Sequence, residues 1–419
     1  MRILFVTWDG PQVHYLESLF LPIFAGLRRE GYEFDILQFR WGSAEEEEAV
    51  RSVCAEAGCG YSSVRVRRWG ALGAFATAML GGLEVRRAVR RFGADAIMPR
   101  SVLPSLAVLS GGGPRLRPVV FDADGLDLDE RVEFDGLKPT GLAYRFLRDI
   151  EAQMVRKATT VLVRTAAARE ILMARSGPPA EPARFTVVAN GRDGRAFHPF
   201  EEGSRQAVRS ELGIAPDAPL VVYVGSFGPK YRTRAVGELA MELRALRPDT
   251  RLLVLSLSPE QVQSELLDHF PGLAGSTTVL RAPFQDVPRY LAAADLGTVF
   301  ITETFSTRTV VPVKTGEYLL CGVPVVGTAA IGDNHAALDA GVFLDDRRGS
   351  AEAARWVVDQ ILPGREDYRR RARAIGLEHY SIERSIRDYR AALQNLVRLK
   401  GPTATRYEDR ERPAPRNTP

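Results

Sequence analysis

Cysteine, histidine and long apolar runs are all scarce in this sequence, and each scarcity argues against a class of protein. The three cysteines, Cys54, Cys59 and Cys321, form no paired C-x-x-C clusters, which argues against a disulfide framework or a zinc site and favours a reduced, cytoplasmic location. None of the five histidines lies four residues from another, so we expect no zinc-binding helix. No apolar run reaches the roughly 18 residues that a membrane-spanning helix needs, so we expect no such helix.

The composition is that of an ordinary globular protein long enough for two domains. Of 419 residues, 45% are hydrophobic and 26% are charged, and the formal net charge of +4 is modest. That charge suits an anionic substrate or a membrane surface and does not require a nucleic acid partner. The chain begins MRILFVTWDG, which has no cleavage-like small-residue site and predicts a first β-strand in place of a signal peptide.

Short apolar runs alternate with amphipathic segments of helical length, which predicts parallel sheets covered by helices. In the first half these runs are Ile3–Thr7, Phe34–Phe39, Ala96–Met98, Val119–Asp122, Thr160–Val163 and Phe185–Ala189. After the linker-like segment His198–Ala218, the pattern restarts with the runs Leu220–Gly225, Arg251–Leu257, Thr277–Leu280, Leu296–Ile301, Val323–Val326 and Val342–Leu344. We therefore predict an α/β protein with two tandem Rossmann-like, doubly wound domains, whose ligands bind at the carboxyl ends of the strands.

The same alternation predicts the domain boundaries. Residues 1–198 form the first predicted domain and residues 199–379 the second. A helical pattern over residues 380–400 is long enough to cross back onto the first domain. Residues 401–419 are polar and rich in proline, which predicts a disordered tail.

The stretch Arg65–Arg91 is basic at both ends and apolar between them. RVRRW precedes the apolar segment Gly70–Leu83, and EVRRAVRR then places four arginines at helical spacing. A basic, partly apolar helix can lie on an anionic membrane, so peripheral membrane contact is one prediction. The alternative is an internal helix of the first domain with a solvated basic end, which the four glycines of Gly70–Leu83 favour.

The segment Val311–Thr328, VPVKTGEYLLCGVPVVGT, combines a helix, a charge pair and a buried strand. Pro312 suits the first turn of a helix that Gly322 ends. The helix N-terminal amides, with Lys314 in the first turn, suit a diphosphate, and Glu317 can accept hydrogen bonds from a ribose diol. The alternative is an i, i+3 ion pair between Lys314 and Glu317 on a solvated face.

A second basic loop, VYVGSFGPKYRTR, follows the first strand of the restarted pattern. Gly225 ends that strand, and Lys230 and Arg232 precede a helix, so the loop is a candidate phosphate cradle. Its glycine spacing matches neither a Walker loop nor G-x-G-x-x-G, so spacing alone gives little support for a nucleotide. Together with Lys314, this loop would supply two basic elements that grip one diphosphate; ordinary surface cations are the alternative.

Two carboxylates and two histidines are further candidates. Asp122 and Asp124 form a D-x-D sequence after a predicted strand, and such a pair can chelate a divalent metal. His14, in the loop after the first strand, is a candidate acceptor contact, with an ordinary loop residue as the alternative. His335 follows the strand after the Lys314 helix and is a weaker candidate.

Several motifs together resemble the glycosyltransferases of the GT-B fold, family 4. In the second half of the chain they are GEYLLCGVPVV, YVGSFGPKY and VPRYLAAADLG, preceded by VVANGRD near the domain boundary. In the first half they are MRILFVTWDG, ESLFLPIF, PRSVLPSLAVL and FDADGLDLDER. The resemblance covers about residues 1 to 400, and GEYLLCGVPVV is its most specific part.

The resemblance implies an acceptor side in residues 1–198 and a nucleotide-sugar site in residues 199–379. It implies that the catalytic cations at the diphosphate are Lys230, Arg232 and Lys314. The donor-binding residues would be Gly225, Ser226, Glu317 on the ribose, and Ser18. The acceptor-side or cleft candidates are Asp9, His14, Arg100, Asp122 and Glu130.

Four positions depart from the family pattern. Thr309 stands where the first glutamate of E-x7-E is expected, and Ser226 stands where arginine is common. Met98 replaces a frequent histidine, and Asp124 replaces a frequent arginine. Because cationic loops take the place of a metal in this fold, the resemblance implies no metal at the D-x-D sequence.

We therefore predict a retaining, metal-free glycosyltransferase that uses a nucleoside-diphosphate sugar as its donor and holds no permanent cofactor. Its acceptor would be a glycan, a lipid-linked molecule or a small molecule, in glycan or secondary-metabolite biosynthesis. The departures at Ser226, Thr309 and Met98 motivate a second hypothesis, a catalytically weakened binding partner of another glycosyltransferase. A sugar-nucleotide epimerase on the same fold is a third.

Overall fold

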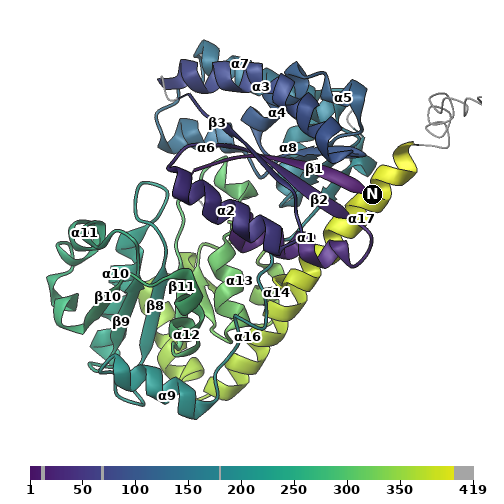
Figure 1. The fold of residues 1–419 in the computed structure, drawn as a ribbon. Coiled ribbons are helices and arrows are strands. Elements are labelled where there is room, and N and C mark those ends of the chain that lie inside the picture. The colour runs from purple at the N-terminus through teal and green to yellow at the C-terminus, as the bar shows by residue number, and fades with distance from the viewer. Residues whose placement is uncertain (11–14, 68–69, 179–180, 401–419) are drawn as a thin grey trace, which may run out of the picture.

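The structure is a computed structural model that describes residues 1–10, 15–67, 70–178 and 181–400. Two α/β domains lie one above the other in Figure 1, and each has a parallel sheet with helices on its faces. This confirms the predicted fold class. Across the described residues, every helix falls short of the length and apolar character that a bilayer crossing requires. The predicted tail, residues 401–419, lies outside the described residues.

The N-terminal domain has a sheet in the order β3-β2-β1-β4, which continues through β5-β6-β7 because Ile97 bridges to Val119 and Arg100 to Asp122. Its strands are β1 (Arg2–Asp9), β2 (Glu33–Arg40), β3 (Tyr61–Arg65), β4 (Ala96–Pro99), β5 (Val120–Asp122), β6 (Thr160–Val163) and β7 (Phe185–Val187). Its helices are α1 (Leu21–Arg28), α2 (Ala44–Glu56), α3 (Gly70–Phe92), α4 (Val102–Ser110), α5 (Gly113–Leu116), α6 (Asp127–Phe134), α7 (Leu142–Lys157) and α8 (Ala166–Ser176).

Strand β3 is absent from the predicted pattern. Its sequence, YSSVR, is mostly polar, and it lies at the sheet edge with only Tyr61 fully buried. The strand forms because its backbone pairs in parallel with β2, from Ile36 opposite Tyr61 to Arg40 opposite Arg65. Arg65 is therefore the last residue of a strand and does not belong to the helix that the basic stretch contains.

The C-terminal domain has a six-stranded parallel sheet in the order β10-β9-β8-β11-β12-β13. Its strands are β8 (Leu220–Val224), β9 (Arg251–Leu255), β10 (Thr277–Leu280), β11 (Leu296–Val299), β12 (Val325–Gly327) and β13 (Phe343–Asp345). Its helices are α9 (Glu202–Glu211), α10 (Thr233–Leu246), α11 (Pro259–Val262), α12 (Val287–Ala292), α13 (Val313–Leu320), α14 (His335–Asp339), α15 (Ser350–Trp356) and α16 (Arg365–His379).

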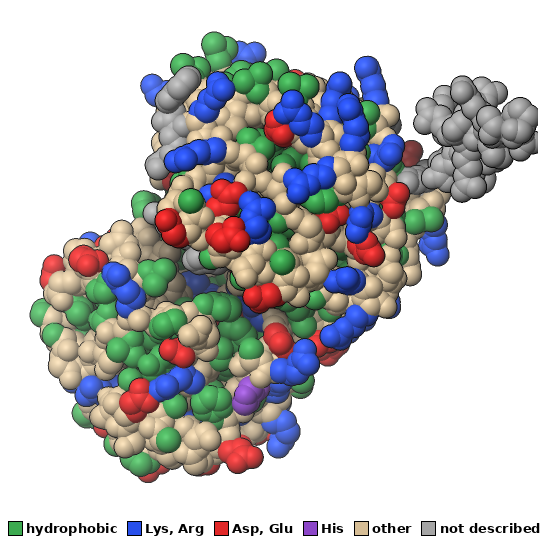
Figure 2. Space-filling view, viewed as in Figure 1, with side chains coloured by type: hydrophobic (Ala, Val, Ile, Leu, Met, Phe, Trp, Pro, Cys, Tyr) green, Lys and Arg blue, Asp and Glu red, His purple; other side chains and the backbone are tan. Residues whose placement is uncertain are grey.

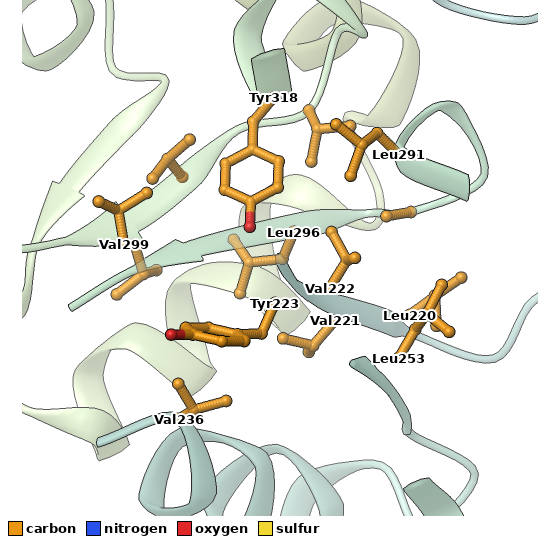
Figure 3. Close-up of a cluster of buried hydrophobic side chains, with 14 of the residues drawn as sticks. Leu220, Val221, Val222, Tyr223, Val236, Leu253, Leu291, Leu296, Val299 and Tyr318 are labelled. Atoms are coloured by element: carbon orange, nitrogen blue, oxygen red, sulfur yellow. The ribbon is translucent and has the colours of Figure 1, made fainter. Parts of the chain in front are cut away.

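Tyr318 fixes helix α13 to this sheet. Its ring is fully buried and points from the helix toward the strands that carry Val222 and Leu296 (Figure 3). A Cβ atom at Gly297 would lie 2.6 Å from that ring, so glycine is the residue that lets helix and strand approach. The Tyr318 hydroxyl accepts a hydrogen bond from the Val224 amide at 3.0 Å. The helix that carries Lys314 and Glu317 is thereby held against the end of β8.

The last helix, α17 (Ile382–Lys400), contacts α1, β6 and β7 of the N-terminal domain. In Figure 1 it runs in yellow along the N-terminal domain. The chain crosses between the domains at Arg192 and again at Ser381, and these two residues bridge to each other. The Arg192 amide donates to the Tyr380 carbonyl at 2.9 Å, and the Ile382 amide donates to the Arg192 carbonyl at 2.8 Å. The two crossings are thus one joint, although the boundaries at residues 198 and 379 stay predictions.

Candidate active site between the domains

Helix α13 brings Lys314 to the carboxyl end of strand β8. Pro312 caps the helix in an extended conformation, so its predicted place in the first turn is wrong by one position. The helix ends at Cys321, and Gly322 follows with a φ of +73°, as its predicted stop requires. Lys314 therefore lies in the first turn, close in sequence to the helix amides that lack a partner within the helix.

The Lys314 ammonium group lies close to two tyrosine rings. Its Nζ is 4.6 Å from the Tyr223 ring centroid and 4.8 Å from the Tyr231 centroid, which favours a cation. Burial nevertheless lowers the pKa of Lys314 to about 8, with the charge of Lys230 lowering it further and Glu317 opposing the shift. A Cβ atom at Gly225 would lie 3.1 Å from the Nζ, and Gly225 has a φ of +127°, so this position needs glycine.

Glu317 is buried and pairs with an arginine of the domain crossing. Its side chain is 8% exposed, and its Oε1 accepts a hydrogen bond from Arg192 Nε at 2.9 Å. The alternative of a Lys314–Glu317 pair on a solvated face is therefore wrong. Arg192 also donates from Nη1 to the Ser18 carbonyl at 2.9 Å and lies 5.5 Å from the centroid of the Phe284 ring. Ser18 thus enters the site through its backbone.

Two cations of the basic loop after β8 pair with different partners. Lys230 Nζ reaches across the domains to Glu130 Oε1 at 2.7 Å and also lies close enough to Lys314 to lower its pKa. Arg232 forms an ion pair with Asp346, beside the end of β13. Ser226 is exposed, and its carbonyl accepts from the Tyr223 hydroxyl at 2.5 Å. The structure therefore brings Gly225, Lys230 and Lys314 together and places Arg232 at the far side of the loop.

A cavity of about 510 Å³ lies beside this loop, where helix α10 begins. Its lining includes Tyr231, Arg232 and Arg234, together with the carboxylates Glu238 and Glu265. The face of the molecule is also hollowed where the two domains meet (Figure 2). Lys314 itself lies near Lys230, which reaches Glu130 of the first domain.

The first domain carries a polar cavity of about 260 Å³ with aromatic walls. Asp9 and Arg100 line it, as do Trp8, Tyr15 and Trp41. Burial raises the pKa of Asp9, while the nearby Arg100 charge and a hydrogen bond from Thr7 oppose the shift. The predicted acceptor-side residues Asp9 and Arg100 thus share one cavity.

Asp122 does not reach this cavity, so its predicted place facing the cleft is wrong. It has no exposed surface, and its carboxylate accepts from Arg164 Nη2 at 2.7 and 3.0 Å. Asp124 forms an ion pair with Arg100. Both carboxylates of the D-x-D sequence are therefore neutralised by arginines, which does not fit metal chelation. Within the described residues there is no group of three or more His, Cys, Asp or Glu side chains arranged to hold a metal.

Of the two candidate histidines, the structure describes one. His14 lies outside the described residues. His335 is exposed at the start of the short helix α14. Its contacts with the described residues assign it no role at the site.

The comparisons with known proteins fall on both domains. The family model described as a glycosyl transferase 4-like domain matches residues 19–191, and the model for glycosyl transferases group 1 matches residues 218–360. The chain belongs to the family-4-like glycosyltransferases. Its fold matches the crystal structure of Anabaena HepE in complex with UDP and glucose, with a TM-score of 0.67, 18% identity, and coverage of 94% of this chain and 99% of that one.

The relatives found by sequence match only part of the chain. It is 28% identical over 273 residues to a D-inositol 3-phosphate glycosyltransferase of Rhodococcus jostii, which covers 60% of this chain and 57% of that protein. It is also 28% identical over 140 residues to an alpha-maltose-1-phosphate synthase of Mycolicibacterium smegmatis, covering 33% of this chain and 35% of the relative. The chain thus matches roughly a third to three-fifths of the length of these relatives.

Two residues of this candidate site were not predicted from the sequence. Arg192 lies in VVANGRD, a motif that was recognised, but its partner Glu317 is 125 residues away. Phe284 follows β10 and is half exposed, with its ring 6.0 Å from that of Phe197. A signal for Phe284 existed, since it follows the end of the predicted strand Thr277–Leu280, and ligands of such sheets bind beyond the carboxyl ends of the strands.

Helix α6 of the first domain contacts the second domain through two glutamates. Glu133 accepts a hydrogen bond from the Thr304 hydroxyl at 2.6 Å and from the Ser306 amide at 3.2 Å. Glu130, one turn earlier, holds Lys230. The glutamate missing at Thr309 is replaced by a buried hydroxyl, 3.5 Å from where a Cβ atom of Gly125 would lie. The first domain therefore contacts the region around residue 309, where the family pattern places that glutamate.

Glu130→Gln is expected to strengthen the binding of a nucleoside diphosphate by up to about fivefold, because a partly exposed ion pair of about 0.2 to 1 kcal/mol no longer competes for Lys230. Isothermal titration with UDP, GDP and ADP measures the change. Glu133→Gln is the matched control, since Glu133 lies on the same helix and bonds Ser306 and Thr304 in place of Lys230. Equal affinities for the native protein and Glu130→Gln would contradict a competition for Lys230.

Proposed function

We propose that the protein transfers a sugar from a nucleoside-diphosphate donor to an acceptor hydroxyl, with retention of anomeric configuration and without a metal. The observation that carries the proposal is the position of Lys314, over Gly225 and beside Lys230, at the carboxyl end of β8. Topological switch points of this kind bind phosphorylated ligands in open parallel sheets. The chain's membership of the family supports the reaction class.

The cations would act on the departing diphosphate. As the bond from the anomeric carbon to the phosphate oxygen breaks, negative charge develops on that oxygen, and Lys314, Lys230 and the first amides of α13 oppose it. The acceptor oxygen bonds to the anomeric carbon on the same face, and its proton passes to the departing phosphate oxygen. Retention follows because bond breaking and bond formation share that face. No strong general base is needed, which agrees with Met98 in place of a histidine.

The donor nucleoside would lie beside Glu317 and Phe284. Glu317 has its Oε1 on Arg192, so the ribose hydroxyls would donate to the remaining carboxylate lone pairs. Arg192, in turn, holds the half-exposed Phe284 ring close to the same carboxylate. An aromatic face next to a ribose site is suited to stack on a nucleobase, a contact that tolerates different bases.

Glu317→Gln is expected to weaken nucleoside-diphosphate binding about tenfold or more, since hydrogen bonds to a charged acceptor contribute about 1.5 to 3 kcal/mol. The affinity for inorganic pyrophosphate, which has no ribose, should stay within about twofold. Titration calorimetry with both ligands separates these effects, and a thermal melt reports any loss of stability from the unpaired Arg192. A parallel loss of pyrophosphate and nucleotide binding would show that Glu317 acts on the phosphates or on the fold.

The acceptor would enter the polar cavity of the first domain. The rings of Trp8, Tyr15 and Trp41 can cover the apolar faces of a sugar or cyclitol, while Asp9 and Asp127 accept from its hydroxyls. Burial raises the pKa of Asp127, as it does that of Asp9. A polyhydroxylated acceptor fits this lining and agrees with the inositol phosphate acceptor in the names of several relatives.

A donor panel tests the proposal directly. The purified chain is incubated with UDP-, GDP-, ADP- and dTDP-sugars and a mixture of polyol and glycan acceptors, with and without EDTA. We expect release of nucleoside diphosphate, acceptor-dependent product with the donor's anomeric configuration by NMR, and full activity in EDTA. A catalytically weakened partner would show neither hydrolysis nor transfer, and an epimerase would convert the donor with no acceptor present.

A further inference from the structure

Helix α3 exposes a continuous apolar stripe on the outer face of the N-terminal domain. The stripe recurs at helical spacing along its first half, and its members are Leu72 (80% exposed), Phe75, Met79, Leu80 and Leu83 (58% exposed). Opposite residues of the helix, such as Ala78 and Val85, are fully buried in the core. The first half of the helix thus has apolar side chains on both its inner and its outer face.

Helix α7 extends this stripe into a patch. The Phe146 ring packs edge-on against Phe75, with centroids 5.2 Å apart, and Leu142 one turn before it is 83% exposed. Figure 2 shows hydrophobic side chains, with basic side chains around them, at the top of the molecule over α3 and α7. Exposing a contiguous apolar patch to water costs free energy, so such a patch indicates an interaction surface.

The second half of the same exposed helix face is basic. Arg86, Arg87, Arg90 and Arg91 follow the apolar stripe along α3, and all four are exposed. One acidic residue, Glu84, lies among them and pairs with Arg87 at 2.5 Å. The surface therefore joins an apolar patch to a cluster with three more positive than negative charges, which complements an anionic, partly apolar partner.

The glycines of α3 do not weaken this surface. A Cβ atom at Gly81 would lie 2.6 Å from the Phe39 ring, and one at Gly82 would lie 2.5 Å from the Gly111 amide nitrogen. Both glycines therefore face inward, where they allow α3 to pack closely on α4 and β2. The glycine content, which favoured an ordinary internal helix at the sequence level, is explained by packing on the inner face and leaves the outer face free.

We propose that the α3–α7 surface docks the protein on an anionic lipid bilayer. Leucine, methionine and phenylalanine side chains enter the boundary between head groups and acyl chains, and the arginine cluster binds the acidic head groups. The acceptor cavity lies one helix layer beneath, since Leu147 of α7 lines it and Ala78 of α3 packs in the cluster with Leu128 at its wall. A docked protein holds that cavity within a helix diameter of the lipid surface.

Co-sedimentation of the full chain with vesicles tests this surface without any need for catalysis. Vesicles of phosphatidylcholine alone are compared with vesicles containing phosphatidylglycerol at about a third of the lipid. We expect binding to the anionic vesicles that weakens at high salt, and at least tenfold weaker binding by the double variant Leu80→Glu, Leu83→Glu. Arg90→Ala with Arg91→Ala should reduce the binding to anionic vesicles and its salt dependence together.

The matched control is the double variant Leu246→Glu, Val397→Glu, which places the same charges at exposed apolar positions of α10 and α17. It should bind vesicles as the native chain does. Absent binding of the native chain to anionic vesicles, or equal losses in the two glutamate double variants, would overturn the proposal. So would a native dimer in lipid-free buffer that Leu80→Glu, Leu83→Glu converts to a monomer, because the surface would then join two copies of the chain.

Discussion

Lys314→Ala is expected to lower kcat for sugar transfer by about 100-fold to 1,000-fold, the effect of removing one preorganised group that stabilises developing negative charge. Its ammonium is fixed by the Tyr223 and Tyr231 rings and by the space that Gly225 leaves, so no rearrangement is needed as the diphosphate departs. Initial rates at saturating donor measure the loss. Lys230→Ala should cost less, because Lys230 is shared with Glu130. Unchanged turnover in Lys314→Ala would remove Lys314 from the mechanism.

The pH profile gives this variant an independent signature. Because the pKa of Lys314 is about 8 in the free protein, its positive charge is present below that pH and is lost as the pH rises through it. The native kcat/KM should therefore decline above a pH of about 8, and that decline should be absent from the residual activity of Lys314→Ala. A decline of the same midpoint in both proteins would assign it to another group.

The same pKa shift separates a catalytic loss from unfolding. The folded pKa of Lys314 is depressed from 10.5, so between a pH of about 8 and 10.5 the unfolded chain binds more protons, and this group makes stability rise with pH. Below a pH of about 8 its charge is present in both states and its burial opposes folding. At pH 7, Lys314→Ala should therefore lower the melting temperature by no more than the loss of the contacts with the Tyr223 and Tyr231 rings accounts for.

The sequence predicts well what depends on neighbours along the chain. The alternation of apolar runs indicates both sheets, and the segment from Val311 to Thr328 contains its own helix start, its charged first turn and its glycine stop. These features are local, since caps, periodicity and turn conformations are decided within a few residues. For the same reason the sequence alone places Gly225 at the end of a strand and Lys314 in the first turn of a helix.

What the sequence does not predict depends on contacts between distant segments. Asp122 ends a strand, like a cleft residue, but Arg164, 42 residues further along the chain, binds its carboxylate. Arg164 in turn donates to Tyr389 of α17, another 225 residues away. Arg192 meets Glu317 because the two domain crossings pair side by side. Periodicity carries no information about such pairs, so the burial of Asp122 and the role of Arg192 became visible only in the fold.

A cluster of buried charges in the second domain illustrates the same limit, with a large expected effect on stability. VPRYLAAADLG was recognised as a family motif, yet nothing local indicates that its Asp295 holds three arginines. Asp295 Oδ1 is 2.6 Å from Arg205 Nη2 and 2.9 Å from Arg365 Nε, and Oδ2 is 3.4 Å from Arg209 Nη1. Arg205 and Arg209 have no exposed surface, and burial lowers the pKa of Arg209 to about 10.

Asp295→Asn is expected to lower the free energy of unfolding by about 3 to 5 kcal/mol, because it leaves buried guanidinium groups without a counter-charge. For a domain of this size that corresponds to a fall of roughly 6 to 20 °C in the melting temperature. Asp249→Asn is the matched control: Asp249 pairs with Arg247 at 2.9 Å, both side chains are about a third or more exposed, and the loss should stay below about 1 kcal/mol. Differential scanning calorimetry compares the two.

The difference between the variants reports the cost of orphaned charges and not a net benefit of the cluster, since a buried ion cluster replaced as a whole by apolar side chains is often no less stable. Melting temperatures that fall equally in the two variants would mean that water or the Ala293 and Ala218 carbonyls, to which Arg209 also donates, compensate the arginines without Asp295.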